Sequence, residues 1–350
     1  MTHLSVSSLG ERALIQRITA RLGASLPARS WVVIGPGDDA AVIEPERGTY
    51  DVLTTDAVVE GIHFDRSFVP MDAVGHRALA VNLSDLAAMG ARPRAALLSL
   101  VLPESLAVTE VDQLLDGLLP LADAHGVAVV GGNITRTAGP LVIDVTAIGS
   151  VKPRRVLTRA GARPGDDVYV TGSLGAAAVG LQALTHERGA DLIRSATASL
   201  TSLAPHAEEC IDRYLRPIPR VRAGVLLGRN RAATSCMDLS DGLADAAHQV
   251  AEASGVGIRI DAPALPIADG VREWHASHGG DPIDSAVAGG DDYELLFTAR
   301  PSQRGRLRAV RTQLGDLPIS RIGAVTRGRD VVLTTATGTR EVPRGYDHFR

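Results

Sequence analysis

Several short segments of this chain place carboxylate, amide and hydroxyl side chains beside glycine. The first is Ile34-Gly-Pro-Gly-Asp-Asp39, in which two glycines and a proline predict a tight turn that ends in adjacent carboxylates. Two ionised carboxylates in one pocket repel each other unless a cation lies between them. The segment therefore predicts a divalent-metal site, and the competing interpretation is a solvated Asp-rich turn.

Five further segments repeat this chemistry at expected strand ends, at Gly-rich turns or on one helix face. They are Thr54–Asp56, Asn82–Asp85, Gly131–Asn133, Asp238–Gly242 and Gly289–Glu294. Oxygen ligands without cysteine favour Mg²⁺ or Mn²⁺ over zinc. Because Mg²⁺ is usually held by one or two carboxylates together with phosphate oxygens and water, the residues alone predict a Mg²⁺-dependent nucleotide enzyme with several ions. An ordinary polar surface is the competing interpretation for each single segment.

Apolar periodicity and the positions of glycine and proline predict the helices and strands that carry these residues. We expect a first half rich in strands, with a capping box at Ser8–Glu11 that starts a helix. A basic, turn-rich stretch at 151–164 predicts the linker, so the expected domains are 1–150 and 151–350. In the first half we expect strands at 31–34, 50–56, 95–102, 127–130 and 141–149, and helices at 73–89 and 109–125. In the second half we expect strands at 167–171, 232–237, 295–299 and 319–325, a hairpin at 331–342, and helices ending near 184, 253 and 314.

Composition excludes several classes of function. The chain has 350 residues, is 45% hydrophobic and has a net charge of -4, without a basic run that could follow a nucleic-acid backbone. Lys152 is the single lysine, so neither a Walker A loop nor a protein-kinase strand lysine is available. The two cysteines, Cys210 and Cys236, do not suggest a disulfide framework. No signal peptide or membrane span is expected, and the predicted location is the cytoplasm.

The six segments, in this order and followed by Gly345-Tyr-Asp-His-Phe349, resemble thiamine-monophosphate kinase over residues 10–349. That family belongs to the superfamily of aminoimidazole ribonucleotide synthetase. The resemblance implies an α/β (α+β) fold of two domains, in which an N-terminal ATP- and Mg²⁺-binding domain dimerises through its sheet and a C-terminal α/β domain follows. It implies a homodimer that transfers the γ-phosphate of ATP directly to thiamine monophosphate, without a covalent intermediate and so without a catalytic nucleophile.

The resemblance also assigns site residues. Several Mg²⁺ ions are expected at Asp39, Thr54, Thr55, Asp56, Asp85, Asn133, Asp238 and Asp241. ATP, the co-substrate, is expected to contact Gly132, Asn133, Arg159 and Ser240. The thiamine phosphate is expected to contact His63, Asp291 and Tyr346, where the tyrosine could stack on a flat cationic ring.

Two residues depart from the pattern of the family, and two other classes remain as alternatives. Many members have Asp where Asn133 stands, and members often have Glu where Asp291 stands.

The first alternative is a superfamily relative with amidine cyclo-ligase or phosphate-activating chemistry. Some of these relatives would carry a reactive cysteine near one terminus. The second is a non-enzymatic Asp-rich cation-binding protein, which would be expected to carry EF-hand calcium loops, and these are absent from the sequence.

Overall fold

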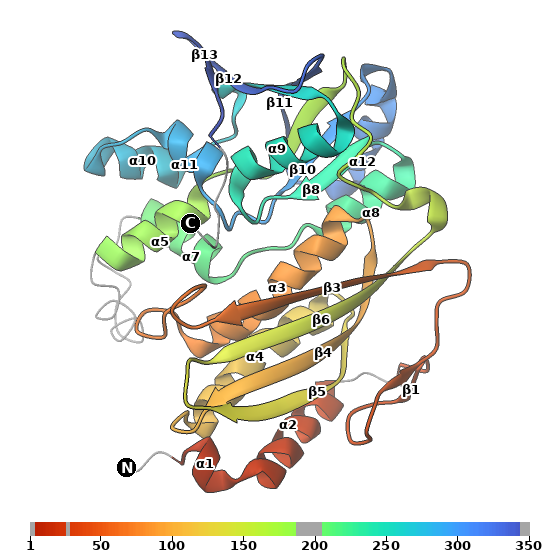
Figure 1. The fold of residues 1–350 in the computed structure, drawn as a ribbon, viewed down its shortest axis with the longest axis vertical. Helices are drawn as coiled ribbons and strands as arrows, with labels where there is room; N and C mark the ends of the chain where they lie inside the picture. The colour runs from red at the N-terminus through yellow and green to blue at the C-terminus, as the bar shows by residue number, and fades with distance from the viewer. Residues whose placement is uncertain (1–3, 26–28, 187–204, 344–350) are drawn as a thin grey trace. The chain divides into compact units, whose positions relative to one another are not determined.

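The computed structural model describes residues 4–25, 29–186 and 205–343. The chain divides into two compact units, one of Met1–Leu86 and Arg92–Lys152, the other of Ala87–Ala91 and Pro153–Arg350. Each unit has its own sheet (Figure 1). Among the described helices, none is long and apolar enough to cross a membrane.

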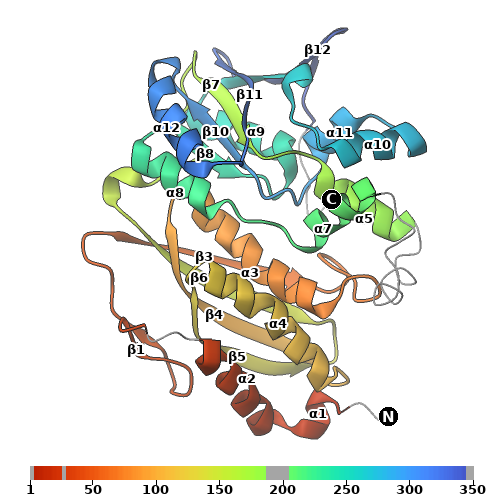
Figure 2. The same cartoon turned by 180° about the vertical axis from the view of Figure 1, so that it is seen from behind.

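The first unit is built on a four-stranded sheet in the order β3-β6-β4-β5. Strands β3 (Tyr50–Val59) and β4 (Arg92–Pro103) both pair antiparallel with β6 (Val142–Val151), and β5 (Ala128–Thr137) runs parallel to β4. The helices α3 (Met71–Ala88) and α4 (Val108–Ala124) cover one face of this sheet, as Figure 2 shows from behind. We call the opposite face the open face.

Alternation along the strands explains the two faces. On β6, Ile143, Val145 and Ala147 are buried toward the helices, whereas Asp144 and Thr146 between them are only half-buried. On β3, the side chain of Leu53 is 67% exposed on the open face. The helix α2 (Glu11–Ser25) and the hairpin β1 (Val32–Ile34) and β2 (Val42–Ile43) lie beside part of this face.

Two glycines let α3 and α4 cross with their backbones in contact. A Cβ atom at Gly75 would lie 1.8 Å from the carbonyl oxygen of Leu114, and one at Gly117 would lie 1.7 Å from that of Asp72. Leu114, Leu115 and Leu118 of α4 are fully buried. This packing fixes α3 and therefore the position of Asp85 on it.

The second unit contains a seven-stranded sheet in the order β13-β12-β9-β11-β7-β10-β8. Its buried core is rich in alanine, valine, leucine and isoleucine, in a chain that is 3% aromatic. The strands are β7 (Asp167–Thr171), β8 (Ser235–Asp238), β9 (Gly257–Asp261), β10 (Leu295–Ala299), β11 (Ile319–Thr326), β12 (Val331–Thr335) and β13 (Gly338–Glu341). The helices are α5 (Ala176–His186), α7 (Pro205–Leu215), α8 (Val221–Asn230), α9 (Gly242–Ser254), α10 (Asp269–His278), α11 (Pro282–Ala288) and α12 (Arg304–Leu314).

Two local predictions were wrong. The N-terminal cap is Ser5, whose hydroxyl accepts from the Ser8 backbone N–H at 3.2 Å, and the short helix α1 (Val6–Leu9) ends before α2 begins at Glu11. The Gly131–Asn133 segment does not form a turn after a strand, because β5 continues through it to Thr137. Hydrogen bonding to β4 holds these glycines in the extended conformation despite their weak strand propensity.

Candidate functional site

Three of the predicted metal ligands lie together at the edge of the first sheet, on its helix-covered side. Thr54 and Asp56 point to the same face of β3 because they are two residues apart. The Thr54 hydroxyl donates to Asp85 Oδ2, which α3 presents to the strand. We call Thr54, Asp56 and Asp85 the edge group.

A buried amide lies beside the edge group. The side chain of Asn82, one helical turn before Asp85, is fully buried, and its Nδ2 donates to the Ala78 carbonyl at 3.1 Å. Its Oδ1 accepts no hydrogen bond from the described residues. An orphaned buried oxygen next to a carboxylate is compatible with a polar or cationic ligand at this edge.

Thr55 faces the opposite side of β3 from the edge group. Its Oγ1 donates to Asp144 Oδ1 at 3.0 Å and lies 3.1 Å from Thr146 Oγ1, and both partners belong to β6. The predicted ligands Thr54 and Thr55 therefore point to different faces of one strand. A single ion cannot use both hydroxyls unless it lies at the exposed rim of the strand.

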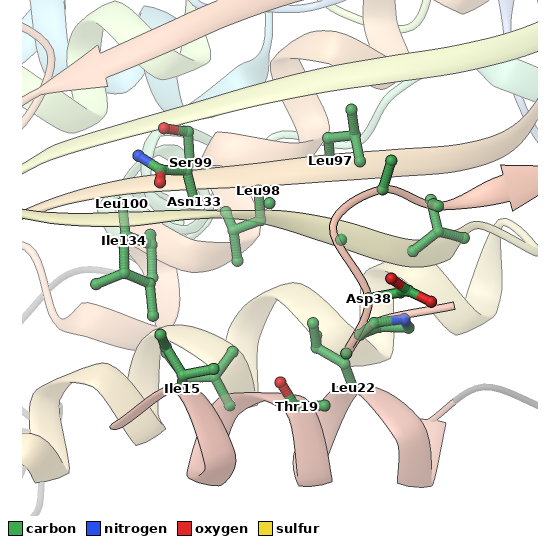
Figure 3. A pocket seen from close by; sticks show the side chains of 18 of the residues that line it. Ile15, Thr19, Leu22, Asp38, Leu97, Leu98, Ser99, Leu100, Asn133 and Ile134 are labelled. Carbon is green, nitrogen blue, oxygen red and sulfur yellow. The ribbon is translucent and has the colours of Figure 1, made fainter. Parts of the chain in front are cut away.

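The open face carries a cavity of about 700 Å³ between α2, the 36–41 loop and strands β4 to β6 (Figure 3). Asp39, Gly132 and Asn133 line it, together with apolar side chains of α2 such as Ile15 and Leu22. In the loop, the Asp39 backbone N–H donates to Asp38 Oδ1 at 2.8 Å. We call Asp39, Gly132 and Asn133 the cavity group.

Gly132 is required by the packing of the sheet. A Cβ atom at this position would lie 1.8 Å from the Leu98 carbonyl oxygen on the neighbouring strand. The resemblance assigns Gly132 to an ATP contact, and the close approach of β5 to β4 is a second reason for a glycine at this position.

The donors of the first unit fit a hard cation in type. They are carboxylate, hydroxyl and amide oxygens, which Mg²⁺ prefers. Within the described residues, no three histidine, cysteine, aspartate or glutamate side chains converge tightly enough to form a metal cage. Mg²⁺ commonly takes only one or two protein carboxylates and completes its shell with phosphate oxygens and water, so the arrangement fits a nucleotide-dependent site better than a permanent structural ion.

In the second unit, the structure brings two predicted motifs into direct contact. Strands β8 and β10 are antiparallel neighbours, so Asp238–Gly242 at the end of β8 meets Gly289–Glu294 at the start of β10. The Asp291 backbone N–H donates to the Ser240 carbonyl at 2.7 Å. A Cβ atom at Gly290 would lie 2.8 Å from that carbonyl oxygen, so the glycine is needed for the contact.

The acidic side chains of this pair of turns differ in setting. Asp238 is buried at the end of β8, and Asp241 immediately precedes α9 at its N-terminus, where the helix dipole favours anions. Asp291 has φ of 68°, a left-handed conformation that is unusual for a residue with a side chain. Tyr293, with φ of 49°, donates its hydroxyl to Asp291 Oδ1 at 3.1 Å. Strain of this kind is concentrated at functional sites.

Arg159 lies along α9. Its Nη1 donates to Gln249 Oε1 at 2.5 Å, and Gln249 in turn donates to Asp245 Oδ2. The structure therefore places the predicted ATP-contacting arginine on a helix that begins directly after Asp241.

The sequence interpretation missed the residues that hold the strained turn. Glu294 is fully buried, and its carboxylate accepts from Arg220 Nε at 2.6 Å and from Thr171 Oγ1 at 2.6 Å. Asp292 accepts from the Gly175 backbone N–H at 2.7 Å at the start of α5. Burial raises the pKa of Asp292 to about 7, although the backbone N–H groups of Gly175 and Ala177 oppose that rise. Asp292 and Glu294 lie in the Gly289–Glu294 segment but were given no role there, and Arg220 and Thr171 carried no sequence signal of their own.

Two predicted substrate residues remain. The Val59 backbone N–H donates to His63 Nδ1 at 3.1 Å in the turn after β3, which fixes the ring orientation. Tyr346 lies outside the described residues.

Comparisons with known proteins agree with this division of the chain. Residues 37–151 match the family model of AIR synthase related protein, N-terminal domain, and residues 163–335 match that of its C-terminal domain. The fold is therefore the two-domain AIR synthase-like fold, as predicted. A thiamine-monophosphate kinase of Salmonella typhimurium is 38% identical over 97% of this chain and 98% of its own length.

Solved structures give the same answer. The thiamine-monophosphate kinase of Stenotrophomonas maltophilia has a TM-score of 0.79 and 41% identity, covering 95% of this chain and 98% of that one. A structure described as AaThiL complexed with AMPPCP and TMP has a TM-score of 0.75 and 34% identity, with 97% of each chain covered. The order of the acidic motifs, the fold and the near-complete length of these matches lead to one conclusion: this chain belongs to the thiamine-monophosphate kinase family.

Proposed function

We propose that this protein transfers the γ-phosphate of ATP to thiamine monophosphate, giving thiamine diphosphate and ADP. The observation that supports this most strongly is the match, over nearly the whole length of both chains, to the relative described as complexed with AMPPCP and TMP. The paired acidic turns of the second unit and the edge and cavity groups of the first supply the oxygen donors that such a reaction needs.

We propose that Mg²⁺ ions are held by Asp39, Thr54, Thr55, Asp56, Asp85, Asn133, Asp238 and Asp241. When bound, the ions would offset the charge of the phosphates. ATP contacts are assigned to Gly132, Asn133, Arg159 and Ser240, and thiamine phosphate contacts to His63, Asp291 and Tyr346. The chain's own residues bind and orient the two substrates, so that in-line transfer needs no covalent enzyme intermediate.

The cysteine-dependent alternatives gain no support from the structure. Both Cys210 and Cys236 are buried, and burial raises the pKa of the Cys210 thiol to about 12 and raises that of Cys236 as well. Because the thiolate is the nucleophilic form, neither side chain is suited to attack a phosphate or carry an activated group.

We propose that the protein works as a homodimer joined through the open face. The edge group lies on β3 and the cavity group includes β5, and these are the two edge strands of the sheet, separated by β6 and β4. Three strand spacings amount to about 14 Å, too far for one ion to touch both groups of one chain. A second copy packed against the open face along β3 would bring its cavity group to the exposed rim of that strand, next to the edge group on the other side of the strand.

The proposed domain roles follow from the same placement. Residues 1–150 would bind ATP and Mg²⁺ and form the dimer, and residues 151–350 would form the C-terminal domain. The cytoplasmic location stays a prediction.

The direct test is ADP release from ATP and Mg²⁺ with and without thiamine monophosphate, with the product identified by mass spectrometry. The proposal predicts that ADP forms only when thiamine monophosphate is present and that thiamine diphosphate appears in equal amount. Release of ADP without thiamine diphosphate would reject the proposed acceptor and favour a superfamily ligase.

A further inference from the structure

One carboxylate of the open face has no place in the assignments above. The β-sheet register pairs Asn133 on β5 with Ser99 on β4, and pairs Ser99 with Asp144 on β6. Residues directly opposite one another on neighbouring strands point to the same face. Asn133, Ser99 and Asp144 therefore form one row on the open face, and Figure 3 shows Ser99 and Asn133 side by side.

Within the part of the chain that the structure describes, Asp144 has one hydrogen-bond partner. Its Oδ1 accepts from the Thr55 hydroxyl at 3.0 Å. Over residues 4–25, 29–186 and 205–343, no other hydrogen bond and no ion pair reaches this side chain, so Oδ2 is available. The residue is half-buried and lines the same cavity as Asp39 and Asn133.

Carboxylate and amide oxygens that line one cavity are the ligands that a hard divalent cation prefers. Asn133, at the other end of the row, offers an oxygen but no charge. The row spans two strand spacings, about 10 Å between backbones, so both side chains line one wall of the same cavity.

We propose that Asp144 is an additional ligand for a divalent cation at the cavity and supplies the negative charge that Asn133 lacks. Its hydrogen bond from Thr55 orients the carboxylate, as partners of metal ligands commonly do. This inference deepens the proposed function, because it adds a ligand to the nucleotide-dependent cation site.

The test is a titration of the protein with Mn²⁺ in the presence of ADP. Binding is measured as the decrease in the electron paramagnetic resonance signal of free Mn²⁺. Asp144→Asn is expected to weaken one class of Mn²⁺ site by about 10-fold or more. Adding Asn133→Asp to that variant moves the charge to the other end of the row and is expected to restore affinity to within about threefold of the original. Asp51→Asn is the matched control, because Asp51 is an exposed carboxylate of β3 that lies on the same open face of the sheet as Asp144.

Equal Mn²⁺ affinity of Asp144→Asn and Asp51→Asn would overturn the proposal, as would a failure of Asn133→Asp to restore binding in the folded double variant. If Asp144→Asn does not fold, Asp144→Thr removes the charge with a strand-favouring residue and is expected to show the same loss. The kinase assay separates the two proposals. Mn²⁺ binding that depends on Asp144 in a protein that makes no thiamine diphosphate would support this cation site and reject the proposed reaction. Normal turnover of the original protein, together with Mn²⁺ binding that Asp144→Asn leaves unchanged, would support the proposed reaction and reject Asp144 as a cation ligand.

Discussion

Asp85 shows how a single side chain joins local structure to chemistry. It lies on α3, whose position is fixed by the close crossing with α4 at Gly75 and Gly117. Its Oδ2 accepts a hydrogen bond from the Thr54 hydroxyl on β3. The carboxylate is thus held at the sheet edge before any ligand arrives. Such preorganisation reduces the free-energy cost of assembling the site at each turnover.

Asp85→Asn is expected to lower kcat by about 100-fold or more, about 3 kcal/mol of barrier, because the amide keeps the hydrogen bond but loses the charge. The free energy of unfolding should change by less than about 1 kcal/mol. Steady-state kinetics at saturating Mg²⁺ and urea denaturation measure the two effects, with Asp51→Asn as the charge control. A variant that keeps full turnover would remove Asp85 from the metal ligands.

Asp292 predicts how stability depends on pH. The folded protein keeps the proton of this carboxyl group up to about pH 7, whereas the unfolded chain releases it near pH 4. Between these values the folded state binds more protons, so this group makes stability fall as pH rises. Asp292→Asn should flatten the slope of Tm between pH 5 and 7, whereas the exposed Asp316→Asn should leave it unchanged. Parallel slopes in both variants would contradict the buried, protonated state.

At the scale of elements, much of the fold was predictable from periodicity. The helix predicted at 73–89 is α3 at Met71–Ala88, and the strand predicted at 50–56 is β3 at Tyr50–Val59. Short elements such as β9 and α11 gave too few repeats to be recognised. Asp144 was missed because strand register, which sets its neighbours, depends on pairing between distant segments and cannot be inferred from one strand alone.

The continuation of β5 through Gly131–Asn133 gives a test at this scale. Gly132→Ala forces a Cβ atom against the Leu98 carbonyl and should destabilise the protein by about 1–3 kcal/mol. The adjacent Gly131→Ala is the control, since its Cβ would lie 3.4 Å from a Leu97 methyl group, and it should cost less than about 1 kcal/mol. Chemical denaturation of both variants measures the difference, and equal losses would mean that β5 is not packed against β4 as described.

At the scale of the whole molecule, the edge and cavity groups of one chain are too far apart to share an ion. In the proposed homodimer, an ion shared by the two groups would be held by two copies of the chain. Each site would then take its edge group from one copy and its cavity group from the other, so that a defect in one group harms only the sites to which it contributes.

Mixed dimers test this arrangement. Asp39→Asn removes a carboxylate of the cavity group and Asp85→Asn one of the edge group, and each variant alone is expected to be inactive. Refolding the two variants together should recover about a quarter of the original turnover, since half of the dimers are mixed and each contains one intact site. Each variant refolded alone serves as the control. If the mixed sample exchanges subunits but recovers no turnover, both groups must act within one chain.

The central claim is phosphoryl transfer to thiamine monophosphate, and the most direct measurement follows the transferred group itself. ATP labelled with heavy oxygen in the γ-phosphoryl group is incubated with the protein, Mg²⁺ and thiamine monophosphate, and the products are weighed by mass spectrometry. The label should appear in the terminal phosphoryl group of thiamine diphosphate, and Asp85→Asn should slow its appearance by about 100-fold or more. Label found only in inorganic phosphate, with thiamine monophosphate unchanged, would contradict the account.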